Sequence, residues 1–332
     1  MTVKIETIAI VGAGSIGGWM GAKLSRCQGV QLSAFARGAT LAALQRDGLQ
    51  LQLKDETIRA KVLASQDAAQ LGQQDLVILA VKATAVREVA AQIAPLLGKQ
   101  TMLLSAMNGV PWWFFEGFGG ALAGQRLQSI DADGHIAEHL PSQHIIGSVV
   151  HASCATRSPG QIVHNFGNGL IIGEPSGQDT PRVQALLALL KEAGFDASLS
   201  PQIQKDIWYK LWGNMTVNPV SAITGATTDK VLGDDLLRGF ISNVMLEAKA
   251  IGEKIGIPIA QQPEDRHQVT LKLGAFKTSM LQDVEAGRAV ELDALVGSVR
   301  EIGNLLGMAT PWTDALLGLA RVHAQRHGLY PQ

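Results

Sequence analysis

Residues 205–219 contain three polar side chains, spaced four positions apart, that could line a binding pocket: Lys210, Asn214 and Asn218. On an α-helix this spacing places all three on one face. Asparagine is a poor helix former, and a solvated helix face usually carries Glu, Lys and Gln instead. A lysine and two asparagines among tryptophans therefore predict a polar pocket wall. The alternative is an ordinary solvated face, and Pro219 predicts that the helix bends or ends near Asn218.

A second set of residues, near the N-terminus, has the spacing of a phosphate-binding turn. The turn has the pattern G-x-G-x-x-G and consists of Gly12, Ala13, Gly14, Ser15, Ile16 and Gly17. The first glycine allows a tight turn, the second lets the backbone approach a pyrophosphate, and the third lets the helix pack on the strand. An apolar strand pattern at residues 8–11 precedes the turn and a helix pattern follows to about residue 27, which is the context of a dinucleotide site. A glycine-rich turn without a ligand is the alternative.

Arg37 bears on which dinucleotide would bind. It lies at the end of an expected second strand, where an NAD-binding chain usually carries Asp or Glu to bond the ribose 2′-hydroxyl. No carboxylate occurs between Gln31 and Arg46. Because an arginine suits a 2′-phosphate, we predict NADP (NADPH), and a solvated loop arginine is the alternative.

Two further polar residues follow predicted strands. Lys82 ends the apolar stretch at residues 75–82, and Asn108 follows the stretch at residues 101–106. Ligands of an open α/β sheet lie beyond the carboxyl ends of its strands, so we expect both residues near the cofactor. A surface lysine and a simple Asn-Gly turn are the alternatives.

Strand and helix patterns alternate through the first part of the chain, as in the strands at residues 30–36 and 75–82 and the helix at residues 85–97. This alternation predicts an N-terminal Rossmann-type doubly wound sheet. Long helical patterns then replace the strands, which predicts an all-α C-terminal domain. We therefore expect an α/β protein with a dinucleotide-binding domain at residues 1–199 and a helical substrate domain at residues 200–332.

Composition excludes several classes of function. The chain has 332 residues, 46% hydrophobic and 17% charged, with a net charge of −1. This balance predicts a globular protein, and it offers no basic surplus for nucleic acid or an anionic membrane. Apolar runs are too short for a membrane span, and the start lacks the apolar region of a signal peptide. Cys27 and Cys154 are too few for a disulfide framework, so we expect a cytoplasmic protein.

The histidines in the middle of the chain are interpreted as scattered surface or hydrogen-bonded residues. They are His135, His139, His144, His151 and His164. We therefore expect no metal site.

Residues 279–293 complete the set that could carry chemistry. Ser279 by itself indicates no function. Glu291 lies near an expected helix start, where a carboxylate is favourable, so stabilising the helix end is the alternative to a functional role. In order along the chain, however, the motifs resemble the ketopantoate reductase (2-dehydropantoate 2-reductase) family. The matching pieces are the glycine turn, Val81-Lys82, Asn108-Gly109, Lys210-Leu211 with Asn214 and Asn218-Pro219, and Ser279-Met280 to Asp283 with Gly287-Arg288 and Glu291-Leu292-Asp293.

The resemblance implies a Rossmann domain, a helical C-terminal domain and NADPH as the hydride donor. It implies Lys210 as the general acid, Glu291 as the group that holds the substrate hydroxyl, and Ser279 as a contact of the substrate carboxylate. Asn214 and Asn218 would assist in binding the substrate, and Asn108 and Lys82 would lie near nicotinamide and substrate. Hydride transfer to a ketone leaves negative charge on oxygen, which a protonated lysine can stabilise and protonate.

The chain departs from the family pattern at residues 111–141, which begin with Pro-Trp-Trp-Phe-Phe. This aromatic segment is either a lid or local core, and we favour local core. The expected reaction is reduction of ketopantoate to pantoate, which belongs to pantothenate and coenzyme A biosynthesis. The alternatives are reduction of another small 2-keto acid and a dinucleotide-sensing protein without turnover. A homodimer through apolar helices of the second domain is a further expectation.

Overall fold

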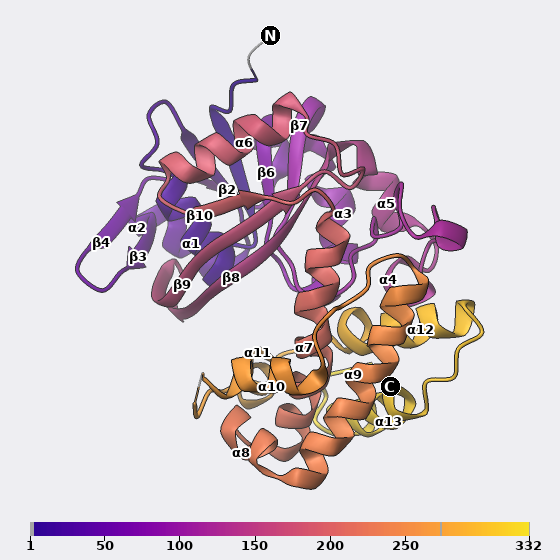
Figure 1. Cartoon of the computed structure of the whole chain (residues 1–332). Helices are drawn as coiled ribbons and strands as arrows, with labels where there is room; N and C mark the ends of the chain where they lie inside the picture. The colour runs from indigo at the N-terminus through magenta and orange to yellow at the C-terminus, as the bar shows by residue number, and fades with distance from the viewer. Residues whose placement is uncertain (1–2, 273, 332) are drawn as a thin grey trace. The chain divides into compact units, whose positions relative to one another are not determined.

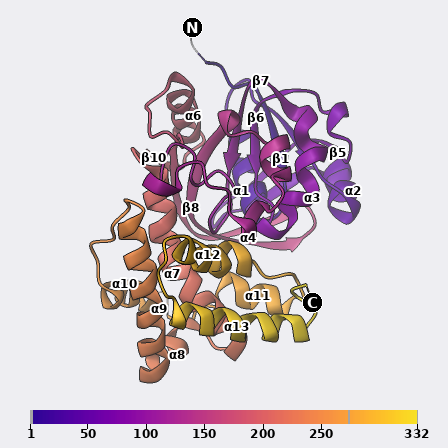
Figure 2. The ribbon, with the colours of Figure 1, turned by 90° about the vertical axis from the view of Figure 1, so that its right-hand side faces the viewer.

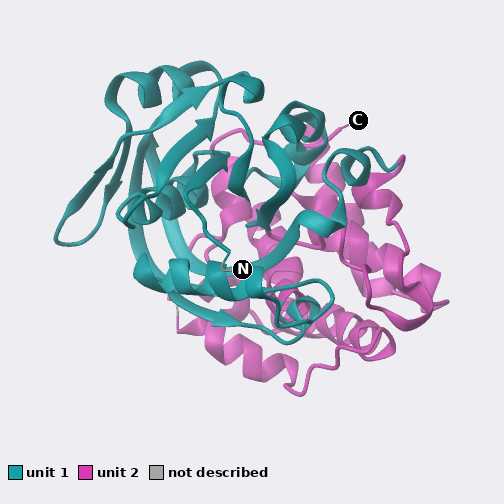
Figure 3. Ribbon diagram, turned by 90° about the horizontal axis from the view of Figure 1, so that it is seen from above, with its two compact units in different colours: residues 1–107, 134–206 teal, residues 108–133, 207–332 magenta. Residues whose placement is uncertain are grey.

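The computed structural model describes residues 3–272 and 274–331. The chain forms two compact units, which Figure 3 colours separately. Unit 1 consists of Met1–Met107 and Gly134–Asp206, and unit 2 of Asn108–Asp133 and Ile207–Gln332. The expected domain boundary between residues 199 and 200 stays a prediction. No helix among the described residues is long and apolar enough to cross a membrane.

Unit 1 is built on a sheet whose centre has the Rossmann strand order. The parallel strands are β1 (Thr7–Val11), β2 (Gln31–Phe35), β5 (Leu63–Ser65), β6 (Gln74–Leu79), β7 (Leu97–Ser105) and β8 (Ile145–Ser158). They lie in the order β5-β2-β1-β6-β7-β8, with parallel pairing at each step. The order reverses between β1 and β6, which is where such sheets bind dinucleotides. The predicted doubly wound sheet is confirmed.

The sheet continues beyond β8 into an extension with both antiparallel and parallel pairs (Figure 1). β9 (Gln161–Gly173) pairs antiparallel with β8, and the added strands are β3 (Leu49–Gln52), β4 (Thr57–Ala60) and β10 (Asp196–Leu199). The apolar patterns at residues 145–150, 161–165 and 170–172 predict three short strands, whereas the chain forms one long hairpin of β8 and β9. β10 was not predicted, because its four residues carry little periodicity.

Helices of unit 1 connect the strands. They are α1 (Ser15–Leu24), α2 (Gly38–Asp47), α3 (Ala83–Ile93), α5 (His135–His139) and α6 (Pro181–Glu192), with 3₁₀ turns η1 (Ala68–Gln70), η2 (Ala94–Leu96) and η4 (Ser142–His144). α1 packs against β1 and the β8–β9 hairpin, α6 against β9 and β10, and α5 against α3. The core between these layers includes Ile8, Ile10, Trp19 and Met20, each at most 1% exposed.

The described elements of unit 2 are helical, as predicted for the C-terminal domain. They are η3 (Gly120–Leu122), α4 (Gln128–Asp131), α7 (Ile203–Thr224, from residue 207 on), α8 (Thr228–Gly233), α9 (Asp235–Lys254), α10 (Pro263–Leu271), α11 (Ser279–Glu285), the π-helix η5 (Asp293–Gly297), α12 (Ser298–Leu305) and α13 (Pro311–Arg326). Two tryptophans fix α7 on α9: Trp208 donates to the carbonyl of Ala248, and Trp212 to that of Met245. α13 also packs against α9 (Figure 2).

The segment from residue 108 to 133 belongs to unit 2 because its side chains and backbone are tied to the helices there. Trp113, Phe114 and Phe115 are at most 2% exposed, and the rings of Phe114 and Trp208 lie 6.0 Å apart. The backbone N–H groups of Gln128 and Ser129 both donate to the Glu301 carboxylate on α12. The aromatic cluster is therefore core, and the lid alternative is wrong.

α7 does not end at Asn218, because the helix continues through Pro219 to Thr224. The alternative that it bends there stays a prediction. A proline removes one helical hydrogen bond. Burial of the following turn, including Val220 and Ser221, offsets that loss. Tertiary packing has overridden the local preference.

Candidate active site

The glycine turn connects β1 to α1 at the reversal of strand order in unit 1. Gly12 has φ +93°, and a Cβ there would lie 2.8 Å from the backbone of Ala80 and Val81, just after β6. A Cβ at Gly17 would lie 2.2 Å from the Gly12 carbonyl oxygen. Gly14, the N-cap of α1, meets nothing within 4 Å, so its backbone side is open to a ligand. The turn therefore fits a pyrophosphate at a helix N-terminus.

The other residues of the turn hold it in place. Ala13 is buried, Ser15 begins α1, and Ile16 packs at the edge of the unit 1 core. The strand–turn–helix context predicted for this motif is confirmed. The cofactor contacts of its individual residues remain predictions.

Arg37 lies just after β2 as the N-cap of α2, and its guanidinium already has a partner. Its Nη1 atom is 2.5 Å from Oε1 of Glu88 on α3. The Arg37 side chain is 48% exposed. Hydrogen bonding to Arg37 lowers the pKa of Glu88 from its ordinary value, so the carboxylate stays charged. A 2′-phosphate at this place would have to share Arg37 with a negative neighbour.

Lys82 does not end a strand, which corrects the predicted strand at residues 75–82. β6 ends at Leu79, and Lys82 is the half-buried N-cap of α3. After β6, the backbone of Ala80 and Val81 lies against Gly12 of the glycine turn. Lys82 still lies beyond the carboxyl end of β6, as expected for a residue near the cofactor.

In unit 2, α7 carries the predicted stripe of Lys210, Asn214 and Asn218 on one face. Asn218 is only 7% exposed, and Lys210 and Asn214 are half-buried. This burial does not fit an ordinary solvated face, and the polar pocket wall remains a prediction.

Lys210 is held in an unusual electrostatic environment. Burial lowers its pKa to about 8, the nearby Glu291 carboxylate raises it, and the Arg266 guanidinium lowers it. Glu291 is itself 5% exposed. A lysine with this pKa is mostly protonated near pH 7 and still close enough to neutrality to release its proton. Lys210 and Glu291, which the family resemblance names as general acid and hydroxyl ligand, thus interact electrostatically in the structure. Their roles in catalysis remain predictions.

Asn108 is anchored next to the helix that follows Glu291. The backbone N–H of Val110 donates to the Ala294 carbonyl at 2.8 Å, and a Cβ at Gly109 would lie 2.5 Å from the same oxygen. Only glycine fits this approach, since Gly109 also has φ +85°. Ala294 lies in the π-helix η5, a rare element often found at functional sites. Gly109 is thus packed closely against η5, while the role of Asn108 near the cofactor and substrate remains a prediction.

Ser279 is the exposed first residue of α11, directly after the N-cap Thr278, whose hydroxyl accepts from the backbone N–H of Leu281. Its predicted contact with a substrate carboxylate remains a prediction. Gly287 follows the last turn of α11 with φ +64°, the left-handed conformation in which a glycine commonly ends a helix.

Arg266 on α10 was missed by the sequence analysis. Its guanidinium carbon lies 5.4 Å from the centre of the Tyr209 ring, and its Nε atom is buried without a hydrogen-bond partner among the described residues. Gly213 leaves room for it on α7. The signal available in the sequence was that mid-helix glycine, which often marks a close approach.

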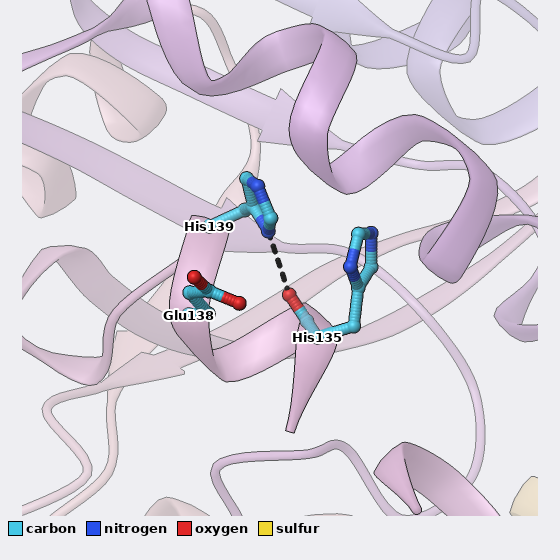
Figure 4. Close-up of side chains that lie close together, drawn as sticks. All are labelled: His135, Glu138 and His139. Carbon is cyan, nitrogen blue, oxygen red and sulfur yellow. Dashed lines mark hydrogen bonds between the residues drawn. The ribbon is translucent and has the colours of Figure 1, made fainter. Parts of the chain in front are cut away.

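The description of the central histidines as scattered is wrong for two of them. His135 to His139 has the pattern H-x-x-E-H, and His135, Glu138 and His139 lie together on α5 (Figure 4). They are in unit 1 and apart in sequence from the residues described above.

Two family models together match most of the chain. The model "Ketopantoate reductase PanE/ApbA" matches residues 8–177, and "Ketopantoate reductase PanE/ApbA C terminal" matches residues 202–324. The chain belongs to the ketopantoate reductase family. Its motifs therefore occur in the family that they resemble, and the chain is an oxidoreductase of that family.

One curated relative and two solved structures show the similarity of this chain to individual proteins. A 2-dehydropantoate 2-reductase of Mesorhizobium japonicum is 44% identical over 97% of this chain and 99% of its own length. The structure of a candidate ketopantoate reductase of Ralstonia solanacearum has a TM-score of 0.95 at 54% identity, covering 98% of this chain and 100% of that one. A D-mandelate dehydrogenase bound to NADH and anilino(oxo)acetate has a TM-score of 0.82, covering 97% and 99% of the two chains. At 21% identity it shows the fold alone.

Proposed function

We propose that this chain reduces 2-dehydropantoate (ketopantoate) to pantoate with NADPH. The observation that carries the proposal is the pairing of half-buried Lys210 with buried Glu291, in which the lysine has a pKa of about 8. Membership of the ketopantoate reductase family supports the substrate.

In this mechanism Lys210 is the general acid. A bound nicotinamide dinucleotide supplies the hydride that reduces the keto carbon. The Lys210 ammonium group stabilises the negative charge that develops on the former carbonyl oxygen and donates the proton that completes the hydroxyl group. Glu291 accepts a hydrogen bond from that hydroxyl, and its charge favours the protonated lysine before each turnover.

The remaining site residues position the two molecules. Asn214, Asn218 and Asn108 orient the keto acid through amide hydrogen bonds, and Ser279 contacts its carboxylate. The glycine turn would hold the pyrophosphate, Arg37 would hold the 2′-phosphate, and Lys82 would lie near the nicotinamide. For NADPH, Arg37 must turn part of its guanidinium from Glu88 to the phosphate.

The proposal is tested by following oxidation of NADPH and of NADH with ketopantoate and a panel of other 2-keto acids. We expect turnover on ketopantoate with the highest kcat/KM and a preference for NADPH. Faster turnover on another keto acid would assign the chain to a related reduction, the alternative that the shared fold of D-mandelate dehydrogenase keeps open. Binding of NADPH without turnover on any substrate would contradict the catalytic role.

We also propose that the enzyme is a homodimer. Trp312, Leu319 and Val322 are 44%, 62% and 64% exposed and follow one face of α13 at helical spacing. A contiguous apolar stripe of this kind is typical of an interaction surface. Light scattering after size-exclusion chromatography should give twice the chain mass, and Leu319→Glu should give a single chain mass. A wild-type monomer would contradict this proposal.

A cytoplasmic location is proposed from the thiols and from the reaction. Cys27 is a buried free cysteine and Cys154 a half-buried one. Such thiols persist in a reducing compartment. Fractionation of the host cell would test the location, and recovery outside the cytoplasm would contradict it.

A further inference from the structure

The helix α5 of unit 1 brings together three metal-binding side chains that the proposed reaction does not use. His135 and His139 are four residues apart, and their ring centres lie 4.5 Å from each other. With Glu138 they offer one ligand atom each, and these atoms lie within 4.8 Å of one another (Figure 4). Among the described residues this is the one group of three or more His, Cys, Asp and Glu side chains with such convergence.

The hydrogen bonding of His139 decides which of its ring nitrogens can bind a metal. Its Nδ1 atom lies 2.9 Å from the carbonyl oxygen of His135. A carbonyl oxygen only accepts, so Nδ1 carries the proton, and in the neutral ring the lone pair is on Nε2. A backbone carbonyl often holds the other ring nitrogen of a metal-binding histidine. In Figure 4 Nδ1 is the nitrogen that faces His135 and Glu138, so binding through Nε2 requires the His139 ring to turn.

The donor set selects the class of ion. Two imidazoles and one carboxylate suit zinc or a similar borderline transition metal, with a fourth position left for water. Magnesium and calcium prefer oxygen ligands throughout, so they fit this set poorly. Zinc ligands at about 2.0–2.1 Å from the metal stand roughly 3.3 Å from each other in a tetrahedron. Rotation of the exposed Glu138 side chain can close the remaining gap.

We propose that His135, Glu138 and His139 form a Zn²⁺ site on α5, separate from the residues that carry reduction. α5 has only five residues and lies between Gly134, with φ +78°, and Leu140. So short a helix is marginal by itself, and a metal that joins positions 135 and 139 fixes its turn. Because α5 packs against α3, bound zinc stabilises this layer of unit 1.

The chain contains a matched control. His323 and His327 on α13 have the same spacing, with ring centres 4.4 Å apart and Nδ1 of His327 2.8 Å from the His323 carbonyl. Among the described residues, no third ligand converges on this pair. If two histidines at this spacing sufficed, both helices would bind zinc equally.

The experiment measures Zn²⁺ binding to the full chain, after removal of metals, by competition with a chromophoric chelator. Three proteins are compared: the wild type, His135→Ala/His139→Ala and His323→Ala/His327→Ala. We expect one site in the wild type, at least tenfold weaker binding in the first variant, and unchanged binding in the second. Equal affinity of wild type and first variant would overturn the proposal, and so would equal weakening in both variants.

Two further measurements keep the test independent of misfolding. Glu138→Gln, which keeps both imidazoles, should weaken Zn²⁺ binding several-fold and leave circular dichroism unchanged. Co²⁺ at the wild-type site should give the visible absorption of a tetrahedral ion, and the Glu138→Gln variant should change it. A Glu138→Gln protein with wild-type affinity and spectrum would exclude the three-ligand site. Turnover is not the readout, so the outcome does not depend on the proposed reaction.

Discussion

Arg266 lies against the backbone of Gly213: a Cβ atom added at Gly213 would be 2.7 Å from Nε of Arg266. Gly213 is three residues along α7 from Lys210. Burial is the main reason that the pKa of Lys210 is lowered to about 8, and the charge of Arg266 contributes. A residue that sequence patterns did not single out thus helps to set the proton affinity of the proposed acid.

Replacing Arg266 should therefore shift the alkaline limb of the pH profile of kcat/KM for the reduction to higher pH. With a pKa of about 8, protonated Lys210 is about tenfold less populated at pH 9 than at pH 7. Arg266→Gln removes a positive charge, raises the pKa of Lys210 and should make the loss of kcat/KM between these pH values smaller. Gly213→Ala, which displaces the guanidinium, should act in the same direction. A pH profile identical to that of the wild type in both variants would contradict this role of Arg266.

Glu291 should have the opposite effect on the same profile. Its carboxylate raises the pKa of Lys210, so Glu291→Gln should lower that pKa and make activity fall earlier as pH rises. We expect the ratio of kcat/KM at pH 9 to that at pH 7 to drop at least twofold below the wild-type ratio. Loss of the substrate hydroxyl contact should lower activity at all pH values, but it would not move the limb. An upward shift would exclude the proposed pairing.

Comparison of Arg266 with Lys210 shows which parts of the candidate site the sequence could predict. Lys210, Asn214 and Asn218 were found by spacing alone, because one helix presents residues four apart on one face. The glycine turn was found because its chemistry is local to one strand, one turn and one helix. Arg266 comes from another helix, α10, and no spacing along the chain relates it to Lys210. The proximity arises only when the helices of unit 2 pack.

The fold shows the same division between local and long-range information. Alternating strand and helix patterns predicted the fold class, a doubly wound sheet. The long β8–β9 hairpin and β10, in contrast, depend on pairing between distant segments. The aromatic segment at residues 111–115 could be described as apolar from the sequence. Its membership of unit 2, however, depends on packing against Trp208, which lies far along the chain on α7. The π-helix η5 had no sequence signal that we could identify.

Lys210→Ala should separate binding from chemistry. The variant keeps the glycine turn and Arg37, so its dissociation constant for NADPH should stay within about twofold of the wild-type value. Removing a general acid should lower kcat by about 10²–10⁴-fold. Fluorescence titration measures the first quantity and nicotinamide absorbance the second. Unchanged turnover would remove Lys210 from the acid role.

Arg37 and Glu88 should control the choice of dinucleotide in opposite directions. Arg37→Ala removes a charge-assisted bond to the 2′-phosphate and should weaken NADPH about tenfold or more, with little effect on NADH. Glu88→Gln ends the competition for the Arg37 guanidinium and removes a negative charge beside the phosphate. It should therefore lower the KM for NADPH and leave that for NADH unchanged. Equal changes for both dinucleotides would contradict the 2′-phosphate assignment.

The buried aromatic cluster should contribute to stability. Phe114 is 1% exposed and packs on Phe115 and Trp208 in unit 2. Phe114→Ala removes a large core side chain and should lower the free energy of unfolding by about 3–5 kcal/mol. Leu63→Ala, at a side chain that is 62% exposed, is the control and should change it by less than about 1 kcal/mol. Chemical denaturation measures both values. If Phe114→Ala unfolds like the wild type but alters the KM for keto acids, the segment acts on substrate instead of the core.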